Sequence, residues 1–110
     1  MNNADFISFD FEMTGLTTQD EGYIDSMQQR YETYADSAQK LSPTQIGICL
    51  WKKNPQKENS FIVDPYTFYL TPLDNFYVQA NAFKFLSKNN YDFNKTFKDG
   101  IFYKNYKNHL

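Results

Sequence analysis

Alternation of apolar and polar side chains near the start of the chain is the feature that most constrains its fold. The apolar positions are Ile7, Phe9 and Phe11, and the polar positions between and after them are Ser8, Asp10 and Glu12. A period of two places each set on its own side of an extended backbone, so the segment 6–12 predicts a β-strand. Thr14-Gly15 then ends the strand.

A helix is expected next, because apolar residues recur at three- and four-residue steps up to Pro43. Its predicted buried stripe consists of Ile24, Met27, Tyr31, Tyr34, Ala35, Ala38 and Leu41. The segment 44–51 is apolar almost throughout and predicts a strand covered on both faces.

The second half of the chain predicts further strands and two short helices. Residues 61–63 and 66–70 are rich in β-branched and aromatic residues, and Asp64-Pro65 interrupts them. A helix over 80–89 has Asn81 as its possible cap, and a helix over 92–99 ends at Gly100. Strands followed by helices over a mixed sheet indicate an α/β or α+β domain.

Length and charge exclude several classes of protein. A chain of 110 residues with 41% hydrophobic residues is one domain or part of one, and it can bury a core. No apolar stretch approaches the roughly 20 residues of a membrane span, and we expect no signal peptide.

Net charge is −2, with −6 in residues 1–50 and +4 in residues 51–110. The single Cys49 fits a reducing compartment.

Asp10 and Glu12 are the two residues whose side chains could form a reactive site. Residues two apart on a strand share a face, so both carboxylates can reach one hard cation such as Mg²⁺. Paired ions of this kind stabilise the attacking and leaving oxygens in phosphoryl transfer. The alternative is that the two acids are the solvated side of an edge strand.

A calcium loop is a rival interpretation of the same residues. Asp10, Glu12, Thr14, Gly15 and Glu21 fall at positions 1, 3, 5, 6 and 12 of the calcium-loop pattern. The period-two flank before Asp10 contradicts it, because such a loop follows a helix.

Other chemically suggestive residues have ordinary structural explanations. Cys49 alternates with apolar neighbours and is expected in the core, and His109 lies in a polar tail. The aromatic cluster of Tyr66, Phe68 and Tyr69 could stack on bases but suits a sheet core better. The lysines that could meet phosphate, or form a solvated face, are Lys84, Lys88, Lys95 and Lys98.

The segment from Asp5 to Leu16 resembles the first motif of the DEDD 3′–5′ exonucleases. Further segments resemble the branch of that family formed by the poly(A)-specific ribonucleases and Caf-type deadenylases. They are Arg30-Tyr31, Gln45-Ile46-Gly47-Ile48-Cys49, Phe68-Tyr69-Leu70 with Pro72, and Asp92-Phe93-Asn94-Lys95 leading to Gly100-Ile101. Oligoribonuclease has a similar first motif, but its next strand follows sooner.

The resemblance implies a ribonuclease H-like α/β fold, of which residues 1–110 would be the N-terminal part, with the strand of Asp10 in the middle of the sheet. It also implies removal of poly(A) from RNA 3′ ends with release of 5′-AMP, as in mRNA decay. Asp10 and Glu12 would be catalytic and would hold two Mg²⁺ ions. Met13, Gly15 and Leu16 would contact the terminal nucleotide.

One part of the family pattern is missing from these residues. The two later aspartates and the general-base histidine are expected beyond residue 110, so this chain alone should be inactive. The alternative is a catalytically incomplete RNA-binding or protein-interaction module. Expected partners are poly(A) RNA, a second copy or the components of a deadenylase complex, without a membrane. The expected location is intracellular, in the nucleus, the cytoplasm or both.

Overall fold

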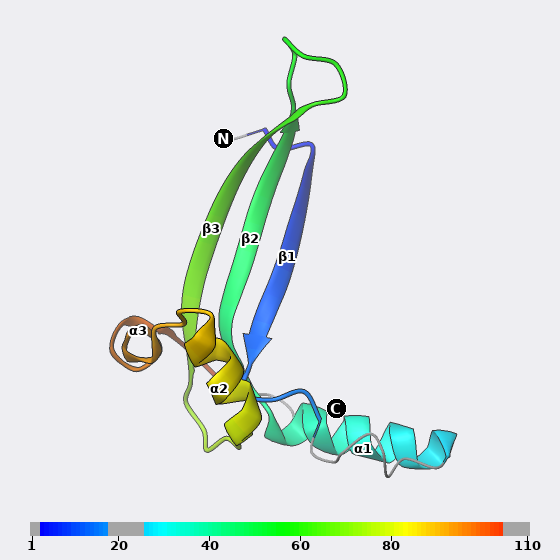
Figure 1. The fold of residues 1–110 in the computed structure, drawn as a ribbon, viewed down its shortest axis with the longest axis vertical. Helices are drawn as coiled ribbons and strands as arrows, with labels where there is room; N and C mark the ends of the chain where they lie inside the picture. Colours follow the sequence, from blue (N-terminus) through cyan, green and yellow to red (C-terminus); the bar gives the residue numbers. More distant parts are fainter. Residues whose placement is uncertain (1–2, 18–25, 105–110) are drawn as a thin grey trace.

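A computed structural model describes residues 3–17 and 26–104, which form a long sheet with helices at one end (Figure 1). Glu21, Ile24 and His109 lie outside the described residues. In chain order the elements are β1 (Phe6–Met13), α1 (Met27–Lys40), β2 (Pro43–Lys53), β3 (Phe61–Pro72), α2 (Ala80–Lys88), α3 (Phe93–Asp99) and β4 (Ile101–Tyr103).

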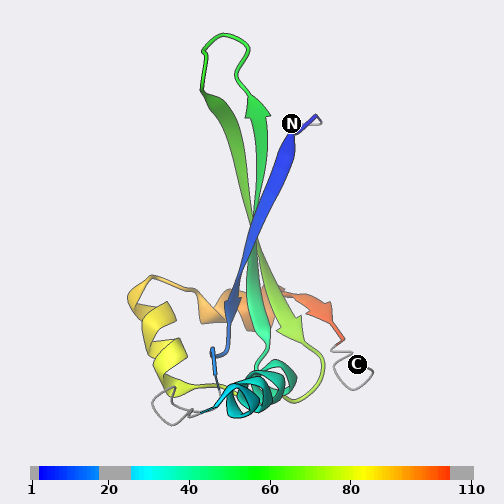
Figure 2. The same ribbon diagram turned by 90° about the vertical axis from the view of Figure 1, so that its right-hand side faces the viewer.

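The sheet has the strand order β1-β2-β3-β4. β1 pairs with β2 and β2 with β3 in antiparallel fashion, whereas β4 runs parallel to the end of β3. The long strands twist around one another, as Figure 2 shows. β1 lies at the edge, so the predicted central position is wrong for the described residues, because none of them pairs with its outer side.

Each face of the sheet has its own chemistry. The register aligns Asp10 with Gly47 and Thr67, and Glu12 with Gln45 and Tyr69. We call this side the acidic face. The other side, the apolar face, carries Ile7, Phe9 and Phe11 of β1, Ile46, Ile48 and Leu50 of β2, and Ile62, Asp64, Tyr66 and Phe68 of β3. The predicted alternation in β1 is therefore confirmed.

The apolar face is largely open in the described part of the chain. Ile7 is 61% exposed and Phe9 67%, while the β2 residues between them and β3 are half-buried. The prediction that β2 is covered on both faces is wrong here. The cause is the position of the helices on the acidic face, where Phe85 of α2 lines a hollow with Glu12 and Lys95 of α3 lies over the Tyr69 ring.

The extended sheet makes the molecule larger than a compact domain of this length. Its radius of gyration is 17.5 Å, compared with about 13 Å for a compact chain of similar length. The accessible surface is 8646 Å², whereas a compact monomer of this mass exposes about 6,300 Å². Only Leu41 and Leu86 are buried hydrophobic residues in the described part.

Helix α1 forms where the sequence predicts it but presents a different face. Its N-cap is Ser26, whose Oγ accepts a hydrogen bond from the Gln29 N–H at 3.1 Å. The buried helix residues are Thr33 and Ser37. Apart from Leu41, the described residues of the predicted stripe are exposed, namely Met27, Tyr31, Tyr34, Ala35 and Ala38. The stripe prediction is wrong because the helix packs through its small polar side.

Strand β3 is continuous, although an interruption was predicted at Asp64-Pro65. Pro65 pairs with Cys49 of β2, and β4 meets β3 only from Leu70 onward. The missing N–H of Pro65 is tolerated because no described strand lies on the outer side of β3 there.

The two short helices and β4 complete the helical end. Gln79, rather than Asn81, is the N-cap of α2, and it makes no side-chain capping bond. Asp92 caps α3 by accepting hydrogen bonds from the Asn94 and Lys95 N–H groups, and Gly100 follows the helix as expected. β4 was not predicted, since three residues are too few for a periodic signal.

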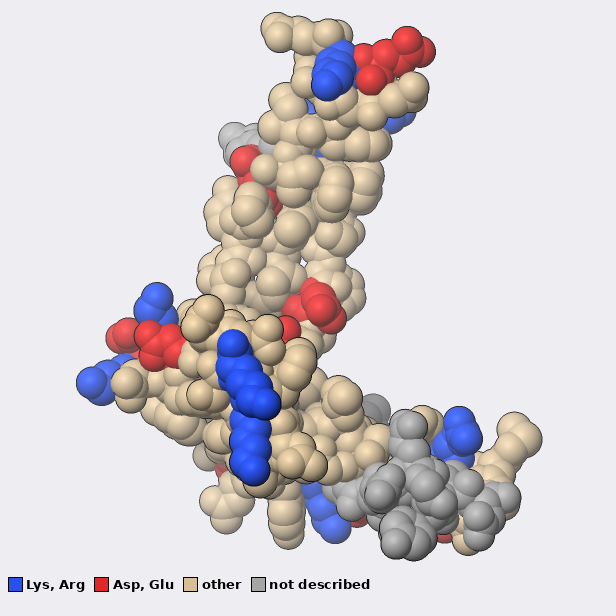
Figure 3. Space-filling model, viewed as in Figure 1, with Lys and Arg blue, Asp and Glu red and all other residues tan. Residues whose placement is uncertain are grey.

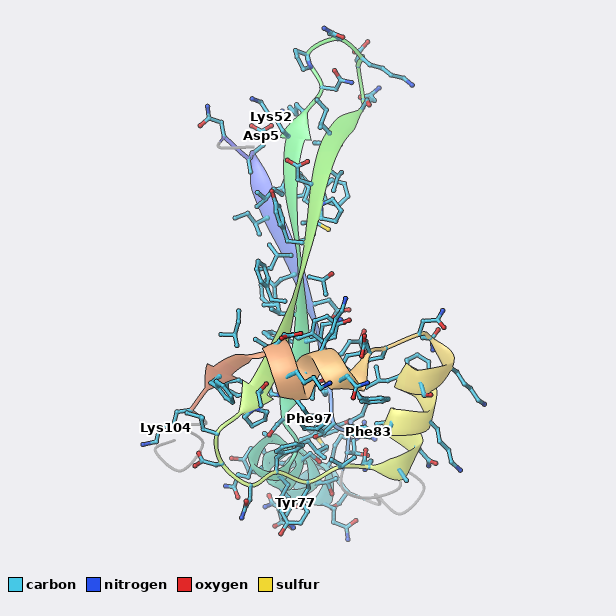
Figure 4. All side chains as sticks on the ribbon, turned by 90° about the vertical axis from the view of Figure 1, so that its left-hand side faces the viewer. Asp5, Lys52, Tyr77, Phe83, Phe97 and Lys104 are labelled. Carbon is cyan, nitrogen blue, oxygen red and sulfur yellow. The ribbon has the colours of Figure 1, made fainter. Side chains whose placement is uncertain are left out.

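Opposite ends of the sheet have different surroundings. In Figure 4, Asp5 and Lys52 lie at the end far from the helices, while Phe83 and Phe97 lie at the helical end. At the end far from the helices, the Phe6 and Trp51 rings stack with centroids 5.3 Å apart. Within the described residues, no helix is long and apolar enough to cross a membrane.

Tyr103 links β4 to the start of β2 and should make the free energy of unfolding vary with pH in the alkaline range. Its hydroxyl donates to the Pro43 carbonyl at 2.6 Å. Burial raises the pKa of Tyr103 from 10.0 to about 12, against a smaller lowering by a hydrogen bond with the Ser42 side chain. The folded state holds this proton more tightly, so its contribution is complete below pH 10 and is lost as pH rises to about 12.

We therefore expect the free energy of unfolding to fall less steeply between pH 10 and about 12 in Tyr103→Phe than in the wild type. Denaturant unfolding followed by circular dichroism checks this. Tyr31→Phe, at a side chain that is 70% exposed, is the matched control. Equal pH dependence in wild type and Tyr103→Phe would contradict the assignment.

Candidate active site

Asp10 and Glu12 leave the same face of β1, as predicted. The register between β1 and β2 is regular from Phe6 to Glu12 and shifts only after Glu12. Alternate residues of a strand lie about 6.6 Å apart. Asp10 is exposed and Glu12 half-buried, so Glu12 is at the helical end and Asp10 one step toward the open part of the sheet.

Gly47 leaves free space beside Asp10. It is the cross-strand partner of Asp10 on β2. A Cβ atom at position 47 would have only one neighbour within 4 Å, the Asp10 carbonyl oxygen at 4.0 Å. The acidic face is therefore open above β2 at the level of the Asp10 carboxylate.

The two carboxylates fit part of the ligand set of a hard divalent cation. Carboxylate oxygens on one face, with open space next to them, suit Mg²⁺ or Mn²⁺. Asp10 Oδ1 also accepts a hydrogen bond from the Phe11 N–H at 3.0 Å, which orients the carboxylate. Within residues 3–17 and 26–104, no group of three or more His, Cys, Asp or Glu side chains is placed to hold a metal.

Glu12 lines two hollows that share Phe85 and Leu86 of α2. The first, about 280 Å³ in volume, is mostly apolar. It is lined by Phe11, Glu12, Met13, Gly15, Leu16, Thr17, Gln79, Asn81, Ala82, Phe85 and Leu86. The second, about 270 Å³, is more polar and includes Gln45, Tyr69 and Asn90. We call the first one the turn pocket.

The turn after β1 is fixed by hydrogen bonds on both sides. The Thr14 N–H donates to the Ser42 carbonyl at 2.9 Å, and the Ser42 N–H donates to Thr14 Oγ1 at 2.9 Å. Thr14 and Ser42 are both fully buried. The Gln79 N–H donates to the Thr14 carbonyl at 2.8 Å, which ties the turn to the start of α2.

The structure brings together all five residues that the sequence singles out as a site. Glu12, Met13, Gly15 and Leu16 line the turn pocket, and Asp10 precedes them on the same face as Glu12. Sequence reasoning missed the opposite wall, formed by Gln79, Ala82 and Phe85 among others. No local pattern marks those residues, because more than sixty positions separate them from the turn.

The other sequence candidates are scattered. Tyr66 and Phe68 lie on the apolar face, whereas Tyr69 lies on the acidic face and packs against Tyr91 with ring centroids 5.5 Å apart. The aromatic trio therefore forms no single platform. Cys49 is free and half-buried rather than in a closed core.

The lysine set divides between two helices, Lys84 and Lys88 on α2 and Lys95 and Lys98 on α3. Figure 3 shows Lys side chains along α2, on the same side of the molecule as acidic residues near the base of the sheet. Lys95 Nζ lies 5.8 Å from the centre of the Tyr69 ring. Lys84 and Lys88 therefore share α2 with Ala82 and Phe85, which line the turn pocket, but neither lysine lines it.

The calcium-loop alternative is wrong for the residues that the structure describes. Asp10 and Glu12 are inside a β-strand that is paired with β2, not in a loop that follows a helix. Glu21, the last position of that pattern, is outside the described residues.

Comparison with protein families shows the family to which the chain belongs. The chain matches the model of the CAF1 family ribonucleases over residues 1–109. The chain belongs to the CAF1 family. CAF1 ribonucleases have the ribonuclease H-like fold, so the α/β class and the predicted family are confirmed. CAF1 nucleases act on RNA and generally depend on divalent metal ions.

Individual relatives are similar along nearly the whole chain. The Arabidopsis thaliana poly(A)-specific ribonuclease PARN is 32% identical over 91% of this chain, and the Mus musculus poly(A)-specific ribonuclease PNLDC1 is 31% identical over 93%. The Bombyx mori pre-piRNA 3′-exonuclease trimmer is 29% identical over 89%. The matches span only 16%, 21% and 20% of these relatives.

Removing either carboxylate should weaken metal binding. We expect Asp10→Asn and Glu12→Gln each to lower the affinity for Mn²⁺ at least about tenfold, because each removes a charged ligand from a small set. Titration with MnCl₂, followed by the electron paramagnetic resonance signal of free Mn²⁺, measures the affinity. Asp64→Asn is the matched control, since it removes one charge from the opposite face. An equal loss in Asp64→Asn would show that only net charge matters.

Proposed function

We propose that this chain carries the first two metal ligands and part of the nucleotide site of a 3′–5′ exoribonuclease that removes poly(A) and releases 5′-AMP. The observation that carries the proposal is the placement of Asp10 and Glu12 on one face of β1, directly before a turn that lines a pocket with α2. Similarity to relatives named poly(A)-specific ribonucleases supports the choice of substrate.

Asp10 and Glu12 are the proposed catalytic residues. Their carboxylates would hold Mg²⁺, with two ions in the complete site. When bound, such ions lower the pKa of an attacking water and neutralise charge on the scissile phosphate. Gly47 leaves room on β2 for the phosphate next to Asp10.

Met13, Gly15 and Leu16 are the proposed contacts of the terminal nucleotide. They form one wall of the turn pocket, and Phe85 of α2 lies on the other. Leu16 is 82% exposed and Phe85 62%, so both offer apolar surface that a base can cover. Lys84 and Lys88 on α2 provide positive charge for neighbouring phosphates.

Two carboxylates are too few to activate a water and accept its proton, so we propose that this chain alone is inactive. The remaining acids and a general-base histidine would come from a longer gene product. Sequencing the transcript beyond codon 110 tests this directly. Two further aspartates and a histidine in added strands and helices would support the enzyme, whereas a stop codon would contradict it.

A catalytically incomplete RNA-binding or protein-interaction module is the second candidate. The open apolar face favours it, because Ile7 is 61% and Phe9 67% exposed, as on a surface that a protein partner covers. For either candidate we propose an intracellular location, in the nucleus, the cytoplasm or both. Proposed protein partners are a second copy or components of a deadenylase complex.

The catalytic proposal is tested on the complete gene product with 5′-labelled oligo(A) in Mg²⁺. We expect stepwise shortening from the 3′ end and release of 5′-AMP. Asp10→Ala should lower kcat by at least about a thousandfold, because it removes a ligand that neutralises charge in the transition state. Asp64→Asn should keep wild-type activity. Undiminished release of 5′-AMP by Asp10→Ala would reject its role.

Gly47→Val should separate stability from activity. A Cβ atom at position 47 meets nothing closer than the Asp10 carbonyl oxygen at 4.0 Å, so the free energy of unfolding should stay the same or rise by about 0.5–1 kcal/mol. The same side chain fills the space beside Asp10, and the rate of oligo(A) hydrolysis should fall at least about tenfold. Gly47→Ala should give a smaller loss. Full activity in Gly47→Val would show that this space is not used by the substrate.

A further inference from the structure

Gln79 makes an unusual set of contacts with the turn that follows β1. It is half-buried and immediately precedes α2. Its N–H donates to the Thr14 carbonyl at 2.8 Å, and its side-chain Oε1 accepts from the Leu16 N–H at 2.9 Å. Its Nε2 donates to the Thr17 carbonyl. One residue therefore holds the turn at three points.

The same residue also begins α2. The Gln79 carbonyl accepts hydrogen bonds from the Ala82 and Phe83 N–H groups at 3.1 and 3.2 Å. Leu16 and Ala82 line opposite walls of the turn pocket. Gln79 consequently fixes both walls relative to each other.

The Gln79 side chain also explains why position 15 is a glycine. No glycine in the described residues has a positive φ, so Gly15 is not needed for a left-handed backbone. A Cβ atom at Gly15 would instead lie 2.6 and 2.7 Å from Cγ and Cδ of Gln79, and closer still to Oε1. Real Cβ atoms essentially never make such contacts, so a side chain at position 15 requires the flexible end of Gln79 to move. The side chain of Gln79 occupies the space that a larger residue would need.

We propose that Gln79 is a positioning residue that sets the shape of the turn pocket before the terminal nucleotide binds. This inference rests on the proposed function of that pocket. Both ends of the Gln79 amide are bonded to the turn, so the residue acts through Leu16 and Thr17 rather than by reading a base. We call the two side-chain hydrogen bonds of Gln79 to Leu16 and Thr17 the clamp. Without the clamp, the turn must be ordered when the nucleotide binds, which weakens binding, while the reacting groups on β1 stay in place.

The expected kinetic signature is a rise in KM with little change in kcat. Gln79→Met keeps the length of the side chain and removes both of its hydrogen bonds. We expect it to raise KM for oligo(A) about tenfold in the complete gene product and to change kcat less than about twofold. Gln56→Met, at an exposed position in the β2–β3 turn, is the matched control and should match the wild type.

A double-mutant cycle tests the steric part of the inference. Gly15→Ala should raise KM strongly in the wild-type background, because the added methyl displaces Gln79. In the Gln79→Ala background, the atoms in its way are gone, so adding Gly15→Ala should raise KM by less than about twofold. Additive effects of the two substitutions would overturn the inference, since distant or uncoupled sites behave additively.

Hydrogen exchange of the Leu16 amide tests the clamp independently of nuclease activity. Its N–H is bonded to Gln79 Oε1, so exchange should speed up about tenfold in Gln79→Met, without any substrate present. If the gene product shows no nuclease activity, this measurement and the effect of Gly15→Ala on it still test the clamp. If the Leu16 amide of Gln79→Met exchanged as slowly as in the wild type, or if an active Gln79→Met enzyme had the wild-type KM, the inference would be overturned, whatever the effect on thermal stability.

Discussion

The antiparallel register between β1 and β2 is the constraint on which the rest of the site depends. It aligns Asp10 with Gly47 and Glu12 with Gln45, and it stays regular until Glu12. A slip of one residue would move both carboxylates to the other side of the sheet, away from the hollow that Glu12 lines with Gln45 and Tyr69. The chemistry of the acidic face is therefore a consequence of strand pairing, before any contact with metal or RNA.

The end of that register is as important as its regular part. The shift after Glu12 releases the chain from the ladder, and Thr14 turns inward to exchange hydrogen bonds with Ser42. The carboxylates consequently lie on a rigid strand while the residues just after them lie on a turn. A site built in this way places its charged groups on a paired strand and its pocket wall on a turn that hydrogen bonds with Ser42 and Gln79 hold in place.

Local pattern predicted what local forces determine. The alternation around Phe9 predicted β1 and the face of Asp10, and Gly100 predicted the end of α3. The stripe around Tyr31 did not predict which side of α1 is buried, because tertiary packing through Thr33 and Ser37 decided that. The edge position of β1, the space above Gly47 and the contact of Gln79 with Leu16 depend on segments far apart in sequence, and no periodicity reports them.

Continuity at Pro65 is a similar case. A proline normally argues against a strand interior, yet β3 passes through it because only β2 is paired at that point. The sequence rule was sound, but the number of neighbours of the strand, which it assumed, is a property of the whole sheet.

The open apolar face has a consequence for how the acids work. Phe9 and Phe11 stand on the same short strand as Asp10 and Glu12, with only the thickness of one backbone between the two sets. Any polypeptide that packs onto the rings of the apolar face restricts the motion of β1. It therefore also restricts the motion of the carboxylates on the acidic face. In the proposed function, such a cover would affect metal binding by Asp10 and Glu12, although it would never touch the RNA.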